Sequence, residues 1–407
     1  GAHKVAEVAF RLAAEYQEWL EDQRLDLYHA TTPFLLGDLV LPFLDVCPLV
    51  ATHYDLIPFI YEDHYFGSDC ASVSKAVYMR ALRFLAAADQ IIAISNHVRR
   101  EAISYLAVPE DRTVVAYPVA DPVFRRLPEG QRKTAISALR ERLDLQGDYF
   151  LAVSHFHHSK NLETLFAAYG NLSREIRRDA PLVLTCHLLP AEQDMVRQWA
   201  EKAGIEEELK LTGLVTDDEL VGLYNSSLAY VHPSRYEGFG LPVLEAMKCG
   251  APVITTTAAS LPEVAGNAAQ LFDPDDASGL TAAMAELAVS AELRERIRIE
   301  GLEHAKKFSP RQLGEATLES YQRAVSTSRR RIHRRPRIAM WTPIPPQRTG
   351  IADYAAELLK PLSKRAEIEV FIDDGVSPDL DLLDDCLVHH HSAFERRHRR
   401  EPFDLII

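Results

Sequence analysis

A chain of 407 residues is long enough to form two or three domains. Its hydrophobic fraction of 47% is that of a globular protein, and no run of about 18 apolar residues predicts a membrane-spanning helix. Acidic residues outnumber basic ones by 59 to 45, and the net charge of -14 argues against a nucleic-acid-binding surface. The five cysteines are scattered without a Cys-x-x-Cys pair, so we expect a reducing, cytoplasmic location.

The first part of the chain alternates predicted helices with short apolar strands. Val5–Leu20 has the pattern of an amphipathic helix, a second helix is predicted over Val73–Ala88, and Ser95 is expected to cap a third that contains Arg99. Strands are predicted at Asp26–His29, Pro48–Thr52, Gln90–Ile94 and Thr113–Ala116. This alternation predicts a parallel, doubly wound sheet, and we place an N-terminal Rossmann-like domain at residues 1–143.

The pattern repeats in a second predicted domain, residues 144–325. Its predicted strands are Tyr149–Val153, Leu182–Thr185, Leu209–Leu211, Leu228–Val231, Val253–Thr255 and Gln270–Phe272. The predicted helices are Lys160–Tyr169, Glu192–Ala203 and Asp217–Tyr224, with two closing helices that reach about Ala324. Two Rossmann-like domains of this kind usually bind a ligand in the cleft between them.

A basic segment follows at residues 326–336, and it is either a solvated connector or a patch that attracts anionic lipid head groups at a membrane surface. The strand-and-helix pattern then restarts over residues 337–407, which predicts the beginning of a third Rossmann-like unit. Its predicted elements are the strands Arg337–Trp341, Glu367–Ile372 and Leu405–Ile407, a loop at Pro343–Thr349 and the helix Gly350–Leu362.

The segment Glu237-Gly-Phe-Gly-Leu-Pro-Val-Leu-Glu245 carries the strongest chemical signal. Gly238 and Gly240 leave the backbone unshielded, so Phe239, Gly240 and Leu241 can present N–H groups to an anion where a helix begins. A carboxylate on each side can hold sugar hydroxyls. The combination suits a sugar linked to a diphosphate.

Further patterns surround this segment in a fixed order: Asp55-Leu-Ile-Pro58, Ala93-Ile-Ser95, Lys160-Asn161, His232-Pro-Ser234, Gly250-Ala-Pro-Val253 and Leu261-Pro-Glu-Val264. Together they resemble the retaining glycosyltransferases of family 4, which have the GT-B fold of two Rossmann-like domains facing a cleft. The resemblance covers nearly all of residues 1–325, and the segment from Arg337 resembles the beginning of a second such enzyme. The whole is similar to bacterial tandem mannosyltransferases that build O-antigen-type polysaccharide.

The resemblance implies roles for residues on the donor side. Glu237 would contact the donor sugar near the reacting carbon, Glu245 would bind the ribose hydroxyls, and Gly238 belongs to the phosphate-facing loop. Lys160 would neutralise the leaving nucleoside diphosphate, which is electrostatic stabilisation where charge develops. Many family members place an arginine five or six residues before this lysine. This chain has Ser154 and His155 there, so His155, His157 or His158 would have to act as hydrogen-bond donor instead.

The first domain is expected to supply the acceptor side. The family often has a histidine directly before the aspartate of the Asp-Leu-Ile-Pro pattern, whereas here His53 lies one position earlier and Tyr54 takes that place. Because a one-residue shift in a strand turns a side chain to the other face, either His53 or Tyr54 takes the catalytic role. Asp55 either orders the loop or contacts the acceptor, and Arg99 faces either the acceptor or solvent.

The family also uses a strand and a glycine-rich loop at the very beginning of its first domain. No such pattern precedes Val5, whereas Pro345-Pro-Gln-Arg-Thr-Gly350-Ile-Ala-Asp353 has it in the third unit. We therefore expect the first domain to lack its opening element.

By resemblance, the expected activity is transfer of a sugar, mannose from GDP-mannose above all, to a growing polysaccharide or lipid-linked glycan with retained anomeric configuration. No Asp-x-Asp metal motif stands in a suitable loop, so neither a metal nor another cofactor is expected, and the acceptor implies peripheral membrane contact. Two alternatives stay open, a sugar-nucleotide epimerase on the same fold and a non-catalytic glycan-binding or scaffold module of a tandem enzyme.

Overall fold

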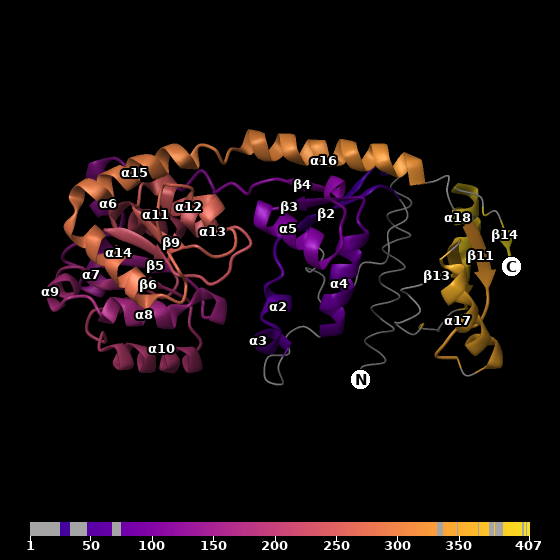
Figure 1. The fold of residues 1–407 in the computed structure, drawn as a ribbon, viewed down its shortest axis with the longest axis horizontal. Coiled ribbons are helices and arrows are strands. Elements are labelled where there is room, and N and C mark those ends of the chain that lie inside the picture. The colour runs from indigo at the N-terminus through magenta and orange to yellow at the C-terminus, as the bar shows by residue number, and fades with distance from the viewer. Residues whose placement is uncertain are drawn as a thin grey trace.

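Three parallel sheets lie in a row, with the first sheet in the middle and the second and third on either side of it (Figure 1). The computed structural model describes residues 25–32, 47–66, 75–331, 337–347, 349–364, 366–373, 378, 386–400, 403 and 405–407. The predicted helix Val5–Leu20 lies outside these residues. Each sheet, with the helices that cover it, forms an α/β unit, and we call them the first, second and third unit.

The first unit has a four-stranded sheet in the order β1-β2-β3-β4, in which all neighbours are parallel. Its strands are β1 (Tyr28–Ala30), β2 (Leu49–His53), β3 (Gln90–Ala93) and β4 (Thr113–Val115). Its helices are α2 (Ile57–Ile60), α3 (Glu62–Phe66), α4 (Lys75–Ala87) and α5 (Asn96–Tyr105). Ser95 caps α5 as predicted, because its hydroxyl accepts the Val98 N–H at 3.1 Å.

The second unit has a six-stranded parallel sheet in the order β10-β9-β8-β5-β6-β7. Its strands are β5 (Phe150–Val153), β6 (Leu182–Thr185), β7 (Leu209–Leu211), β8 (Ala229–His232), β9 (Val253–Thr256) and β10 (Gln270–Phe272). Its helices are α6 (Glu129–Ala135), α7 (Ser137–Leu143), α8 (Leu162–Gly170), α9 (Arg174–Asp179), α10 (Pro190–Ala203), α11 (Asp217–Ser226), α12 (Leu241–Cys249), α13 (Leu261–Ala265), α14 (Ala277–Val289) and α15 (Ala291–Ala305).

The inner strands of this second sheet, β5, β6, β8 and β9, are buried over almost their whole length because helices cover both faces, and they are largely apolar for that reason. Alternate residues of one strand enter different cores. Leu151 of β5 packs in the core that contains Val243 of α12, whereas Phe150 packs in the opposite core with Leu165 of α8. Helices therefore cover both faces, as the doubly wound prediction requires.

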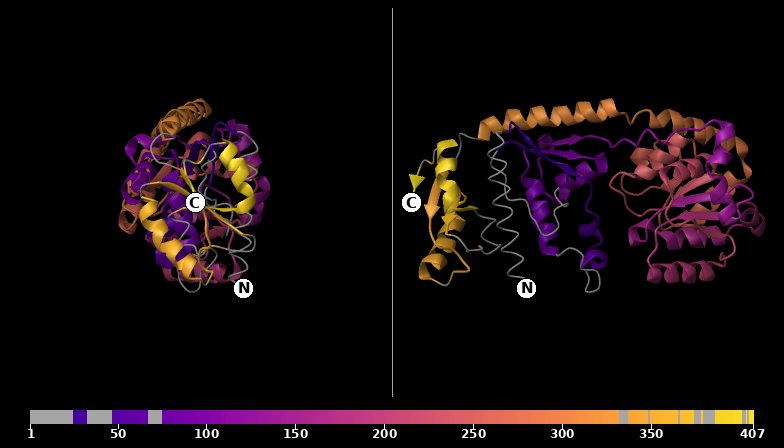
Figure 2. Two further views of the ribbon diagram at one scale, coloured as in Figure 1. Left: turned by 90° about the vertical axis from the view of Figure 1, so that its right-hand side faces the viewer. Right: turned by 180° about the vertical axis from the view of Figure 1, so that it is seen from behind.

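The long helix α16 (Pro310–Arg331) leaves the second unit and returns to the first (Figures 1 and 2). Its Ala324 is fully buried against Val50 of β2 and Ile92 of β3, while α4 packs on the other face of that sheet. A hydrogen bond of 2.9 Å also joins Nδ1 of His29, in β1, to the hydroxyl of Tyr321, in α16. The first sheet thus owes one of its two covering layers to a helix that follows the whole second unit.

The third unit has a parallel sheet in the order β13-β12-β11-β14. Its elements are β11 (Arg337–Trp341), α17 (Gly350–Leu362), β12 (Glu367–Ile372), β13 (Leu387–His390), α18 (Phe394–Arg400) and β14 (Leu405–Ile406). One face carries a buried carboxylate, Glu369, which pairs with Arg337, Arg397 and His389. Burial alone would raise the pKa of Glu369, but the His389 hydrogen bond and the Arg397 guanidinium hold it well below its usual range.

Most predicted strands agree with the structure, and β6, β7, β10, β11 and β12 have the predicted bounds. The helix predicted from Lys160 begins two residues later, at Leu162, because the residues before it form a tight 3₁₀ turn, His158–Lys160. The closing region contains α14, α15 and α16 rather than two helices, and α16 continues to Arg331, past the predicted end near Ala324. None of the helices described here is long and apolar enough to cross a membrane.

The contact between α16 and the first sheet leads to a stability prediction. Ala324 has no exposed surface, so Ala324→Leu must displace neighbours and should lower the free energy of unfolding by about 1–3 kcal/mol. Leu318→Ala on the same helix is the control, since Leu318 is 54% exposed and its change should stay within about 0.5 kcal/mol. Urea titration of both variants measures this, and equal midpoints would contradict the packing described.

Candidate functional site

The two strands at the centre of the second sheet, β5 and β8, place the predicted donor residues side by side. Lys160 follows β5 and Glu237 follows β8, and these strands are neighbours with parallel register. Because the carboxyl ends of parallel strands meet at one edge of a sheet, the two loops meet there as well. This is the usual ligand edge of a doubly wound sheet.

Glu237 and Lys160 form a buried ion pair at this edge. The Lys160 Nζ donates to Glu237 Oε1 at 2.6 Å, and their side chains are only 13% and 11% exposed. His232 Nε2 lies 3.1 Å from the same oxygen, and the His232 Nδ1 lies 2.8 Å from the Tyr230 hydroxyl. The carboxylate therefore lies between an ammonium group and an imidazole that Tyr230 holds in place.

These partners fix the charge of Glu237. Burial alone would raise the pKa of this carboxyl, but the hydrogen bond from His232 and the Lys160 ammonium hold it well below its usual range. Glu237 is consequently an anion at any physiological pH. Glu237 is thus a buried negative charge paired with a cation at the edge of the sheet where ligands usually bind.

Asn161 connects the loops that carry these two residues. Its backbone has φ 58°, and its amide donates to the Pro233 carbonyl at 3.0 Å and the Pro274 carbonyl at 2.7 Å. The Arg235 guanidinium contacts the Asn161 side-chain oxygen. Asn161 is 2% exposed, so its function is to hold the loop of Lys160 against the loop of Glu237. The sequence pattern Lys160-Asn161 pointed to this residue, but it did not reveal that Asn161 bonds to the Pro233 and Pro274 carbonyls.

The loop after Glu237 has no space for larger side chains. A Cβ on Gly238 would lie 2.1 Å from the Tyr54 carbonyl oxygen of the first unit, and one on Gly240, which has φ 98°, would lie 2.7 Å from Leu261 Cδ2. Phe239 is buried in the core and anchors the loop, so its side chain is not part of the ligand surface. Leu241 begins α12, and its N–H has no partner within the helix, whereas Pro242 has no N–H and the Val243 N–H bonds to the Gly240 carbonyl at 3.0 Å.

Glu245 lies in the second turn of α12 and is partly buried. The Tyr224 hydroxyl donates to its Oε2 at 3.3 Å. Burial raises the pKa of Glu245 to about 7, against the opposing effect of the Tyr224 hydrogen bond. The two glutamates of the segment therefore differ, since Glu237 is permanently charged and Glu245 titrates near neutrality.

The histidine-rich loop after β5 meets α3 of the first unit. His158 stacks on His64 with ring centroids 4.2 Å apart, and His157 packs 4.7 Å from Tyr65. Burial lowers the pKa of His155, and the nearby Lys160 ammonium lowers it further, so that His155 is neutral at pH 7 and has one N–H to donate. Tyr65 had no signal in the sequence, because only the fold brings α3 to this loop.

The end of β2 brings the predicted acceptor-side residues to the same place. His53 is fully buried and neither of its ring nitrogens has a hydrogen-bond partner, whereas Tyr54 is 43% exposed. Burial lowers the pKa of His53 to about 4, so the ring is neutral. Asp55 accepts the Ile57 N–H at 3.0 Å, and burial raises its pKa, with the Glu101 and Glu237 carboxylates adding to the effect. Asp55 thus orders its loop and also lies beside the ion pair.

Arg99 is not brought to the site. Its guanidinium donates to Thr113 at 2.8 Å and to Glu110 at 2.9 Å, both within the first unit. The buried acid of α5 that does face the second unit is Glu101, which is 4% exposed and accepts a hydrogen bond from the Tyr236 hydroxyl. A glutamate inside a helix gave no functional signal in the sequence.

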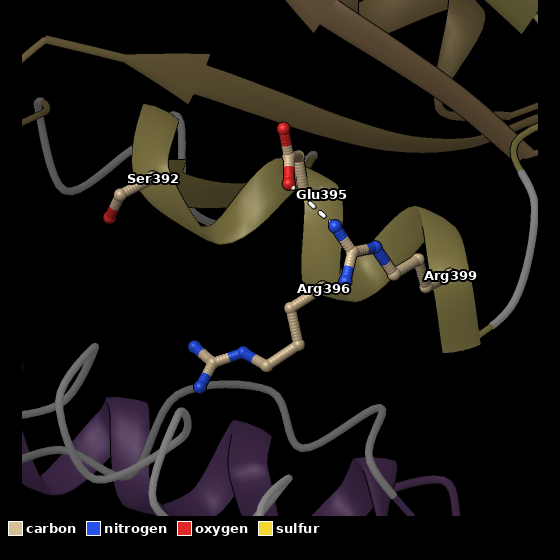
Figure 3. Close-up of a pocket in the computed structure, with 4 residues that line it drawn as sticks. All are labelled: Ser392, Glu395, Arg396 and Arg399. Atoms are coloured by element: carbon tan, nitrogen blue, oxygen red, sulfur yellow. Dashed lines mark hydrogen bonds and ion pairs between the residues drawn. The ribbon is translucent and has the colours of Figure 1, made fainter.

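Other features of the described residues lie away from this chemistry. No group of three or more His, Cys, Asp or Glu side chains among them could hold a metal ion. A hollow of about 520 Å³ lies in the third unit, lined by Ser392, Glu395, Arg396 and Arg399 (Figure 3). Arg399 pairs there with Glu395 at 2.9 Å, and none of the predicted site residues belongs to this hollow.

The buried ion pair gives a prediction for stability. Lys160→Met removes the cation and leaves Glu237 with His232 alone, so we expect a loss of about 3 kcal/mol in the free energy of unfolding at pH 7. Since the folded pKa of Glu237 is depressed, its contribution is present above the ordinary value of 4.5 and is lost as the pH falls below it. In the variant, the loss of stability as the pH falls below 4.5 should therefore be shallower than in the wild type.

The double variant Lys160→Met/Glu237→Gln is the control for this pair. It removes both charges and should cost less than the two single changes added together, because no charge is left buried alone. Denaturant titration of all four proteins at pH 7 measures the coupling, and strictly additive losses would contradict it.

Comparison with known proteins places this geometry in a family. Residues 2–124 match the family described as "Glycosyltransferase Family 4", and residues 138–304 match the family described as "Glycosyl transferases group 1". The O-antigen chain mannosyltransferase B of Escherichia coli is 30% identical over 273 residues, which cover 67% of this chain and 70% of that protein. The serotype-specific mannosyltransferase WbdA of Escherichia coli is 30% identical over 289 residues, 71% of this chain and 34% of WbdA. The chain thus spans about a third of the length of WbdA.

Solved structures agree on the architecture. Anabaena HepE in complex with UDP and glucose superposes with a TM-score of 0.62 at 20% identity, covering 77% of this chain and 81% of HepE. The sucrose-phosphate synthase of Thermosynechococcus elongatus has the same TM-score at 20% identity, covering 80% of each chain. With two parallel α/β units, the paired loops of Lys160 and Glu237, and these matches, the chain belongs to the glycosyltransferases of the group 1 and family 4 type, with the GT-B fold.

Proposed function

We propose that this chain transfers a hexosyl group from a nucleoside diphosphate to a saccharide hydroxyl, with mannose from GDP-mannose as the favoured donor. The observation that carries the proposal is the buried Glu237–Lys160 pair at the carboxyl edge of the second sheet. Mannose is favoured because the relatives WbdA and mannosyltransferase B of Escherichia coli are named mannosyltransferases. The O-antigen chain in the name of mannosyltransferase B supports a polysaccharide acceptor. We further propose that the acceptor is a growing polysaccharide or a lipid-linked glycan and that the protein acts in the cytoplasm, peripherally at the inner face of the cell membrane.

In the proposed reaction, the bond between the anomeric carbon and the β-phosphate oxygen breaks, and the nucleoside diphosphate leaves with the electron pair. The acceptor oxygen forms the new bond to the anomeric carbon on the same face, and its proton passes to the departing phosphate. Lys160 neutralises the charge that develops on the diphosphate, and the backbone N–H groups of Phe239, Gly240 and Leu241, where α12 begins, add to this effect. The cation is thus a side chain of the chain itself, and the proposal requires no metal.

The remaining residues have supporting roles in this proposal. Glu237, held anionic by His232, binds hydroxyls of the donor sugar and stabilises positive charge at the anomeric carbon. Glu245 binds the ribose, and His155 supplies the N–H that an arginine gives in other family members. On the opposite side either His53 or Tyr54 takes the catalytic role; His53 is fully buried with neither ring nitrogen hydrogen-bonded, whereas Tyr54 is 43% exposed. We further propose the boundaries 1–143, 144–325 and 326–336, and residues 337–407 as the beginning of a second glycosyltransferase unit.

Transfer itself is the first test. The purified protein, incubated with a set of nucleotide sugars and a mannose oligosaccharide, should form a glycoside whose linkage and anomeric configuration are read by NMR. Glu237→Gln should lower kcat by about 100-fold or more, because it removes charge at the reacting centre. Glu300→Ala, an exposed glutamate on α15, is the matched control and should keep full activity. An epimerised nucleotide sugar without any glycoside would reject transfer, and a non-mannose donor alone would reject the choice of sugar.

The titration of Glu245 gives a second test. A carboxyl that accepts hydrogen bonds from ribose hydroxyls binds best when ionised, and burial raises its pKa to about 7. The affinity for a nucleoside diphosphate should therefore rise as the pH increases from 6 to 8. In Glu245→Gln this rise should become smaller, while the titration of the phosphate itself remains as in the wild type. Calorimetry at three pH values measures both, and parallel pH profiles would exclude a role for Glu245 in ribose binding.

A further inference from the structure

The second unit touches the first two turns of α5 at three places. The Ser95 hydroxyl donates to the Gly238 carbonyl at 2.7 Å, and the Tyr236 hydroxyl donates to the Glu101 carboxylate. The third contact is made by Glu263 of α13, which reaches the beginning of α5. All of these join the loop of Glu237, or the helix beside it, to one helix of the opposite unit.

Glu263 makes the most extensive of these contacts. Its Oε1 accepts from the Asn96 backbone N–H at 2.9 Å, from the Asn96 side-chain amide at 2.7 Å and from the Tyr117 hydroxyl at 2.5 Å. Its Oε2 accepts from the His97 N–H at 3.3 Å. The first N–H groups of a helix lack partners within the helix and carry a partial positive charge, so a carboxylate there is favourable. Here the carboxylate comes from the other unit.

The helix that carries Glu263 also holds the loop of Glu237. Ser260, directly before α13, donates to the carbonyl oxygens of Glu237 at 2.8 Å and Phe239 at 2.9 Å. Leu261 of the same helix fills the space beside Gly240, where a Cβ would not fit. Only two residues lie between Ser260, which fixes the loop, and Glu263, which binds α5. A displacement of α13 must move both contacts together.

We infer that Glu263 is a positioning residue, which joins the two units at the beginning of α5 and thereby sets the place of the Glu237 loop opposite the acceptor side. This inference rests on the proposed function. Glu263 would then act in transfer without touching donor or acceptor. Lys160, Glu237 and Glu245 all belong to the second unit, so binding of the nucleotide does not need the contact. Transfer to an acceptor needs both units, so it does need the contact that Glu263 makes.

The inference is tested with Glu263→Ala in the whole protein. We expect kcat for transfer to fall by about 10-fold to 100-fold, from the loss of hydrogen bonds to a charged group. The Kd for a nucleoside diphosphate should stay within about twofold of the wild type, since the free energy of its binding arises in the second unit. The radius of gyration from small-angle scattering should increase, because the units separate. Glu300→Ala should change none of the three.

Two milder variants keep the test decisive if Glu263→Ala folds poorly. Glu263→Gln keeps an acceptor oxygen but loses the charge, and should recover part of kcat. Tyr117→Phe removes one donor to the carboxylate and should lower kcat less than Glu263→Gln does. A purely structural role would lower the melting temperature and the nucleotide affinity together, and that outcome would overturn the inference. A wild-type kcat in Glu263→Ala would overturn it as well. If the wild type neither binds nucleotide nor transfers sugar, the proposed function fails instead.

Discussion

A carboxylate inside a protein stays ionised only while cations and hydrogen-bond donors surround it, and this condition organises the region between the first two units. Glu237 meets it through Lys160 and His232, which come from the ends of two adjacent strands. Asn161 in turn holds the two loops together. If any of these contacts is lost, the desolvation cost of the carboxylate is no longer offset. The central order β8-β5 of the second sheet is thus tied to the electrostatics of one side chain.

The same region is limited by space as much as by charge. Gly238 touches the Tyr54 carbonyl, and Gly240 touches Leu261, so the loop between the two glutamates has neighbours on both sides that allow no Cβ. A loop so confined cannot relax when its charge partners change. The electrostatic and steric constraints therefore act on one short stretch of backbone, from Glu237 to Gly240.

Much of this architecture could be predicted from the sequence because its signals are local. Buried parallel strands are short apolar runs, and β6 or β12 could therefore be placed to the residue, as could the Ser95 cap. The grouping of Lys160 with Glu237 followed from a family resemblance. By contrast, Glu101, Tyr65 and Glu263 act through contacts with residues far away in the chain, so no spacing could reveal them. Short helices such as α2 and α9 also escaped prediction, because fewer than two turns leave no periodic pattern.

The return of α16 to the first sheet has a mechanical consequence. Within the described residues, the chain passes between the first and second units twice, once after β4 and once before α16, and both passages run along the same side of the molecule (Figures 1 and 2). The passages touch, since the rings of Tyr117 and Phe308 lie 5.5 Å apart, and Phe239 packs against both. Two adjoining crossings on one side form a single pivot, so any relative movement of the units would be a swing about it. The loop of Glu237 is anchored beside this pivot through Phe239, so such a swing would displace the loop less than the far edges of the units.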